Sequence, residues 1–153
     1  MKKYVFFVTS FLFLNFNLMA RSENFSDSTY LVRQARALEK IYKHWRIPFN
    51  PKTSIELWPG VFGKVDQGKR VLVLNLSHRG LLGSIPVELA DLTALQELKL
   101  SYNHLTGLVP VSLGKLIHLR KLSLEKNRLK EVDKFREYMK RKNPSCDLEL
   151  NQR

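Results

Sequence analysis

Cysteine is almost absent from this chain of 153 residues, which contains only Cys146. A single cysteine excludes an internal disulfide framework. No cysteine and histidine cluster has zinc-site spacing, because the histidines are scattered at His44, His78, His104 and His118. Cys146 has no histidine close to it in sequence, so we interpret it as a half-buried structural thiol rather than a nucleophile.

Motifs of catalytic chemistry are missing as well. The sequence contains no nucleophile elbow, phosphate-binding loop, metal-binding motif or pair of catalytic carboxylates. We therefore expect no enzymatic activity, no cofactor and no metal, and we look for function in a binding surface.

Acidic residues are outnumbered by basic ones, 14 to 26, which gives a formal net charge of +12. This excess favours acidic proteins or anionic surfaces as partners but carries no information about the fold. Two basic runs stand out: Arg33, Arg36, Lys40, Lys43 and Arg46, and Arg128, Lys130, Lys134, Arg136, Lys140, Arg141 and Lys142. Both are typical of solvated helix faces, and both could instead adhere to an anionic membrane, cell wall or polysaccharide. No basic stripe is interleaved with aromatic rings, so specific nucleic-acid binding is not expected.

A long apolar run occurs only near the N-terminus. Met1-Lys2-Lys3 is followed by an apolar stretch over 4–14 and by a small residue, Ala20. This layout predicts a secretory signal peptide over 1–20 and a secreted, periplasmic or extracellular protein. The run is short for a membrane span, and the alternative is an uncleaved N-terminal membrane anchor. Two glycosylation sequons are present, at Asn24 and Asn75.

From Val71 onward, apolar residues recur every 24 residues. The recurring sets are Val71, Leu95, Leu119; Leu74, Leu98, Leu122; Leu76, Leu100, Leu124; Leu81, Leu105, Leu129; Ile85, Val109; Leu89, Leu113; and Leu92, Leu116. Two leucines two positions apart point to the same side of a short strand, and stacked repeats place these strands in a parallel sheet.

Polar and special residues share the period. Asn103 and Asn127 occupy one position, where an amide can both donate to and accept from the backbone, whereas Arg79 in the first repeat cannot accept. Gly83 and Gly107 suit a left-handed backbone. Pro86 and Pro110 indicate an extended return segment, in which no backbone N–H is needed at these positions to bond a neighbouring strand.

The run Leu98-x-Leu100-x-x-Asn103-x-Leu105-x-Gly107-x-Val109-Pro110 resembles the plant-type 24-residue leucine-rich repeat. The resemblance covers Val71 to Leu129 and implies a recognition protein. The element Trp58-x-Gly60-Val61 is similar to part of the N-terminal cap of that family. Plant receptors usually carry a cysteine pair in this cap, and its absence here fits a short bacterial or protist form better.

The predicted fold is therefore an α/β solenoid, a short leucine-rich-repeat arc with a parallel sheet on its concave face and helical caps at both ends. We divide it into a signal peptide (1–20), an N-terminal helical cap (21–70), about three repeats (71–130) and a C-terminal cap helix with a closing strand (131–153). The first cap helix carries Leu31, Ala35, Leu38, Tyr42 and Trp45 on one face and could be capped by Asp27 or Ser28. The second spans 131–142, with Val132, Phe135 and Met139 on one face, and Leu148 and Leu150 predict the last strand.

The outward-facing residues of the strands form the candidate partner-binding surface, which we call the concave face. They are Val73, Asn75, Ser77, His78, Glu97, Lys99, Ser101, Tyr102, Lys121, Ser123, Glu125 and Lys126. Strands about 4.8 Å apart give a face of roughly 200 Å², whereas a standard protein interface buries about 800 Å² per partner. The expected partner is therefore a peptide or a small epitope of a protein, unless the caps contribute to the interface or several copies act together.

Overall fold

The computed structural model describes residues 25–53, 57–61 and 70–152, with the side chains of 25–28 excepted. The predicted signal peptide and the sequon at Asn24 lie outside the described residues. Nothing in the described part of the chain forms a helix long and apolar enough to cross a membrane.

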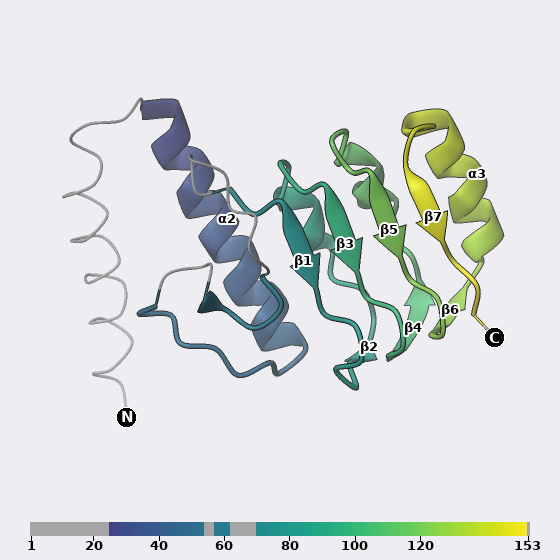
Figure 1. Cartoon of the computed structure of the whole chain (residues 1–153), viewed down its shortest axis with the longest axis horizontal. Helices are drawn as coiled ribbons and strands as arrows, with labels where there is room; N and C mark the ends of the chain where they lie inside the picture. The colour runs from purple at the N-terminus through teal and green to yellow at the C-terminus, as the bar shows by residue number, and fades with distance from the viewer. Residues whose placement is uncertain (1–24, 54–56, 62–69, 153) are drawn as a thin grey trace.

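Four short parallel strands form the main sheet, in the order β1-β3-β5-β7 (Figure 1). They are β1 (Val73–Asn75), β3 (Glu97–Lys99), β5 (Lys121–Ser123) and β7 (Asp147–Glu149). Leu74 pairs with Leu98 and Leu98 with Leu122, so the ladder advances in the register of the repeated leucines. Leu122 pairs with Leu148, and the strand expected around Leu148 and Leu150 is thus β7.

A second parallel sheet, which the repeat pattern did not predict, follows the main strands in each repeat. Its strands are β2 (Leu82–Gly83), β4 (His104–Leu108) and β6 (Arg128–Lys130). Leu105 and Leu129 turn inward and hold alternate residues of these strands in extended register. Pro86 and Pro110 lie outside this sheet in extended conformation, as predicted. Figure 1 shows the two sheets as separate surfaces of the molecule.

Two short 3-10 helices complete the repeats, η2 (Val87–Asp91) and η3 (Val111–Lys115). Each begins directly after a proline, Pro86 or Pro110, in extended conformation. All the recurring apolar positions of the sequence are buried between the sheets and these helices in one continuous core. The burial of a complete set of periodic side chains is what makes the repeats stack.

Buried amides hold neighbouring repeats together. Asn103 and Asn127 are both buried, as their shared position predicted. The Nδ2 atom of Asn127 donates to Leu100 O and Leu124 O, at 3.0 and 2.9 Å, and its Oδ1 accepts from Leu105 N at 3.1 Å. Such bonds satisfy backbone groups that the short strands leave open.

The helix α2 (Phe25–His44) packs against η2 at the N-terminal end of the sheets (Figure 1). It begins at Phe25, before Asp27 and Ser28, so neither of these residues is its N-cap, contrary to the sequence-based expectation. Its buried face also differs in part from the one predicted, since Leu31 and Ala35 are only half-buried. The buried residues of α2 are Gln34, Ala37, Leu38, Ile41 and Tyr42.

The stretch from Trp58 to Val61 covers the free edge of β1. Val61 forms an antiparallel bridge with Leu74, and Asn75 N donates to Gly60 O at 2.7 Å. Gly60 has a φ of +88°, and a Cβ there would lie 2.4 Å from Asn75 O, so only glycine fits. Trp58 is buried and contributes to the core beneath this stretch.

The helix α3 (Val132–Lys142) packs against η3 at the other end, with Phe135 and Met139 buried. It starts one residue later than expected, because Glu131 adopts a left-handed conformation and serves as the N-cap. Lys140, Arg141 and Lys142 form its last turn, where positive charge complements the helix dipole.

Candidate functional site

The concave face is built from alternate residues of the main sheet, because every second side chain of a strand points away from the core. Cross-strand pairing places the face residues in rows, with Val73, Glu97, Lys121 and Asp147 in one row. The next row contains Asn75, Lys99, Ser123 and Glu149. The sheet thus adds Asp147 and Glu149 to the predicted surface.

Charged residues in these two rows neutralise one another. Lys99 Nζ lies 3.0 Å from Glu97 Oε2, and Lys121 Nζ lies 2.7 Å from Glu149 Oε1. Hydrogen bonds from Lys121 and Ser123 lower the pKa of Glu149, and the same bond with Glu149 raises the pKa of Lys121. This half of the concave face is therefore satisfied internally and offers few free charges to a ligand.

The half of the concave face at the carboxyl ends of the strands is arranged differently. Ser77 Oγ lies 3.0 Å from Ser101 Oγ. The rings of His78 and Tyr102 stack with centroids 4.4 Å apart and an interplanar angle of 12°. His78, Tyr102 and Lys126 share a left-handed backbone with φ near +55°, which turns their side chains out of the sheet in register.

Glu125 and Lys126 continue this half of the face into the third repeat. Neither side chain forms a hydrogen bond or ion pair with any other described residue. Both border a hollow between the end of the main sheet and α3. The hollow is lined by Glu125, Lys126, Val132, Asp133, Arg136, Leu150, Asn151 and Gln152.

The accessible surface is smaller than the predicted set of twelve residues. Val73, Ser101 and Ser123 are buried, and they offer little area to a partner. Tyr102 is the opposite case, with 46% of its surface exposed although it is a large aromatic residue. Asn151 also lines the hollow but was not among the residues predicted from the sequence. The 26-residue spacing from Leu122 to Leu148 extends the repeat to the last strand and could have indicated it.

Comparison with known proteins agrees with this architecture. A family described as "Leucine rich repeat" matches residues 68–132. The LRR ectodomain of the receptor kinase SOBIR1 from Arabidopsis thaliana is 31% identical and superposes with a TM-score of 0.52. The fold is a leucine-rich-repeat solenoid.

The match to the SOBIR1 ectodomain covers 63% of this chain and 55% of that one. A match to the crystal structure of PEPR1-AtPEP1, at 26% identity and a TM-score of 0.55, covers 63% of this chain and 15% of the other. The present chain therefore spans about half, or much less, of the length of these relatives. A search of curated proteins found no match.

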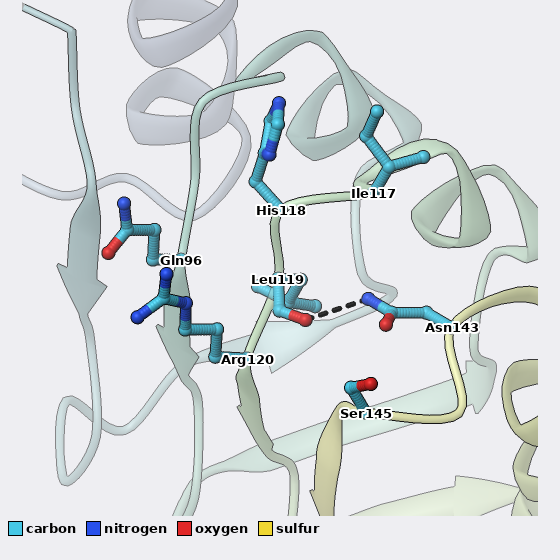
Figure 2. A pocket seen from close by; sticks show the side chains of 7 residues that line it. All are labelled: Gln96, Ile117, His118, Leu119, Arg120, Asn143 and Ser145. Atoms are coloured by element: carbon cyan, nitrogen blue, oxygen red, sulfur yellow. Dashed lines mark hydrogen bonds between the residues drawn. The ribbon is translucent and has the colours of Figure 1, made fainter.

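A second hollow, of about 280 Å³, lies at the amino ends of the strands of the leucine-rich-repeat solenoid. It is lined by Gln96, Ile117, His118, Leu119, Arg120, Asn143 and Ser145. Figure 2 shows Asn143 turned inward, where its Nδ2 donates to Leu119 O at 2.7 Å, while Arg120 extends toward Gln96. Asn143 thereby ties the segment after α3 to the third repeat.

The two basic runs of the sequence are partly neutralised in the folded chain. Upstream, Arg33 pairs with Asp91, Lys40 with Glu88 and Lys43 with Glu39. Downstream, ion pairs join Lys134 to Glu131, Arg136 to Asp133 and Lys140 to Glu137. Half of these cations thus have a carboxylate partner, which weakens the field that the caps present.

Cys146 is buried, and burial raises the pKa of its thiol to about 11. A thiol that stays protonated at neutral pH is a poor nucleophile. Among the described residues, no group of three or more His, Cys, Asp or Glu side chains could hold a metal ion.

Proposed function

We propose that this chain is a non-catalytic recognition module that binds a protein or peptide on its concave face. The observation that carries the proposal is the stacked pair of His78 and Tyr102, which lies beside the unpaired Glu125 and Lys126. Exposed aromatic rings held rigidly by a scaffold are typical binding anchors, because they bury much area and lose little entropy.

The size of the face limits the partner. About 200 Å² of strand surface is a fraction of the roughly 800 Å² that a standard partner buries. A short peptide or a projecting loop that crosses the stacked rings and enters the hollow beside α3 fits this area. The SOBIR1 relative is the ectodomain of a receptor kinase, which supports recognition as the role of the present fold.

We further propose export, with residues 1–20 as a signal peptide and 21–70 as an N-terminal cap. The repeats then span 71–130, and 131–153 form the C-terminal cap. The packing of α2 on η2 and of α3 on η3 supports the two caps, since each covers one end of the core. N-terminal sequencing of the native protein tests export: a start near Arg21 is expected, and an intact Met1 on membrane-bound protein would favour the anchor.

A site-specific photocrosslinker tests the binding face. Benzoylphenylalanine in place of Tyr102 should form a covalent adduct with a protein or peptide when the protein is exposed to its native compartment. The matched control is the same substitution at Lys115, an exposed residue of η3 that is remote in the repeat from the concave face. Adducts formed equally at both positions, or only at Lys115, would contradict the proposal.

A further inference from the structure

The outer side of the second sheet combines free cations with exposed aliphatic side chains. We call this side the second-sheet face and define it by six exposed residues. They are Leu82, His104, Thr106, Leu108, Arg128 and Lys130. Leu82 and Leu108 have 69% and 58% of their surface exposed.

The basic residues of this face have no acidic partner among the described residues. Within the described part of the chain, His104, Arg128 and Lys130 form no ion pair or side-chain hydrogen bond. The adjoining acid is Glu131, and its carboxylate already lies 3.1 Å from Lys134 Nζ. The second-sheet face is therefore positive without internal compensation.

Strand pairing alternates the two kinds of side chain. Leu82 lies opposite His104 and Leu108 lies opposite Lys130, so each leucine has a basic neighbour on the adjacent strand. Lysine and arginine can reach outward past a leucine to an anionic headgroup while the leucine enters the layer below.

We propose that the second-sheet face attaches the protein to an anionic phospholipid bilayer. A bilayer supplies both negative headgroups and an apolar layer, which a polysaccharide or a free polyanion does not. Neither of the two hollows described above includes a residue of this face. The three strands offer even less area than the four strands of the main sheet, so a protein partner would be limited here to a small epitope.

This attachment uses residues other than those of the proposed recognition surface. The main sheet and the second sheet are distinct (Figure 1), and neither His78 nor Tyr102 belongs to the second-sheet face. The inference does not depend on the proposed function, because vesicle binding and partner crosslinking use different residues.

Flotation of the full chain with vesicles tests the proposal. Vesicles of phosphatidylcholine containing about 30% phosphatidylserine should bind the protein, and each Lys or Arg at such a surface raises the partition coefficient about fivefold. The double variant Arg128→Glu with Lys130→Glu should therefore lower the partition coefficient by at least about 25-fold. Pure phosphatidylcholine vesicles control for the apolar residues 4–14, which need no negative headgroup.

The matched control is Arg141→Glu with Lys142→Glu, which changes the net charge equally at two exposed positions of α3. It should weaken binding much less than the Arg128 and Lys130 reversals, and circular dichroism should show both variants folded. Leu82→Ser with Leu108→Ser should make the remaining binding more sensitive to salt, because only electrostatic attraction is left. Equal loss in both charge-reversal variants would overturn the proposal, as would no preference for anionic vesicles. Tighter binding of polyglutamate than of vesicles through Arg128 and Lys130 would also overturn it and indicate an acidic protein partner.

Discussion

The side-chain oxygen of Asn103 lies 3.0 Å from the backbone nitrogen of Leu81, one repeat earlier in the chain. The same oxygen accepts from Arg79 N, and the amide nitrogen donates to Leu76 O and Leu100 O. One buried side chain therefore joins the second repeat to three backbone groups of the first. Two repeats that share so many bonds are expected to unfold together.

Asn103→Ala should lower the free energy of unfolding by about 1–3 kcal/mol, because it leaves buried backbone groups without partners. Urea denaturation measures the change. Asn75→Ala is a suitable comparison, since Asn75 Oδ1 makes a single bond to Ser77 N at the surface, and its cost should be smaller. Equal effects of the two substitutions would show that the buried amide is not important for stacking.

Leu98→Ala or Leu100→Ala should each lower the free energy of unfolding by about 2–5 kcal/mol. Both side chains are completely buried in the middle repeat, so their loss leaves a cavity between two neighbours. Leu108→Ala provides the control, because that leucine is exposed and its removal should change stability little. A thermal melt of Leu98→Ala that matches the unmodified protein would be inconsistent with the strand register.

Gln152→Ala should destabilise the C-terminal end, although the residue lies almost at the end of the sequence. Its Oε1 accepts from Leu129 N at 3.1 Å and its Nε2 donates to Leu124 O at 3.1 Å, which repeats the role of Asn127. We expect a loss of about 1 kcal/mol and faster hydrogen exchange at Leu129. Asn151→Ala changes the neighbouring exposed residue and should leave both quantities near their original values.

Acid should weaken the concave face through Glu149. Its pKa is lowered by the hydrogen bonds from Lys121 and Ser123, so the folded state holds this carboxylate ionised more strongly than the unfolded chain, where the pKa is about 4.3. The bond therefore stabilises the fold above the unfolded pKa, and this contribution disappears as pH falls through the folded pKa.

Glu149→Gln should accordingly reduce the urea midpoint at neutral pH and make it fall less steeply between about pH 5 and pH 3. Asp147→Asn is the matched control, since Asp147 lies 3.9 Å from Lys121 and contributes more weakly. If Glu149→Gln retains the full acid dependence of the unmodified protein, other carboxylates are responsible for it.

Asn75 should be free of glycan in the native protein, although Asn75-Leu76-Ser77 is a sequon. Asn75 lies on the concave face beside Lys99, and a glycan there would cover much of a face only about 15 Å wide. Mass spectrometry of the native protein gives the answer. A fully occupied glycan would contradict binding on the concave face and place the binding surface away from the main sheet.

The repeat pattern by itself determined the solenoid. Leu74, Leu98 and Leu122 recur at a constant spacing. Apolar side chains repeated at a constant spacing can all be buried only if successive repeats stack on one another. The same reasoning placed Asn103 and Asn127 in the interior, because an amide at a repeated position has the donors and acceptors that strand ends require.

Tertiary structure alone decided which surface residues remain available. The sequence shows that Glu97, Lys99 and Lys121 are on one face, but only their distances to each other and to Glu149 show that they are paired. The free charges of the second-sheet face depend in the same way on where each carboxylate lies. Periodicity reports which side of a strand a residue occupies, whereas ion pairing depends on distances between strands, which no single repeat contains.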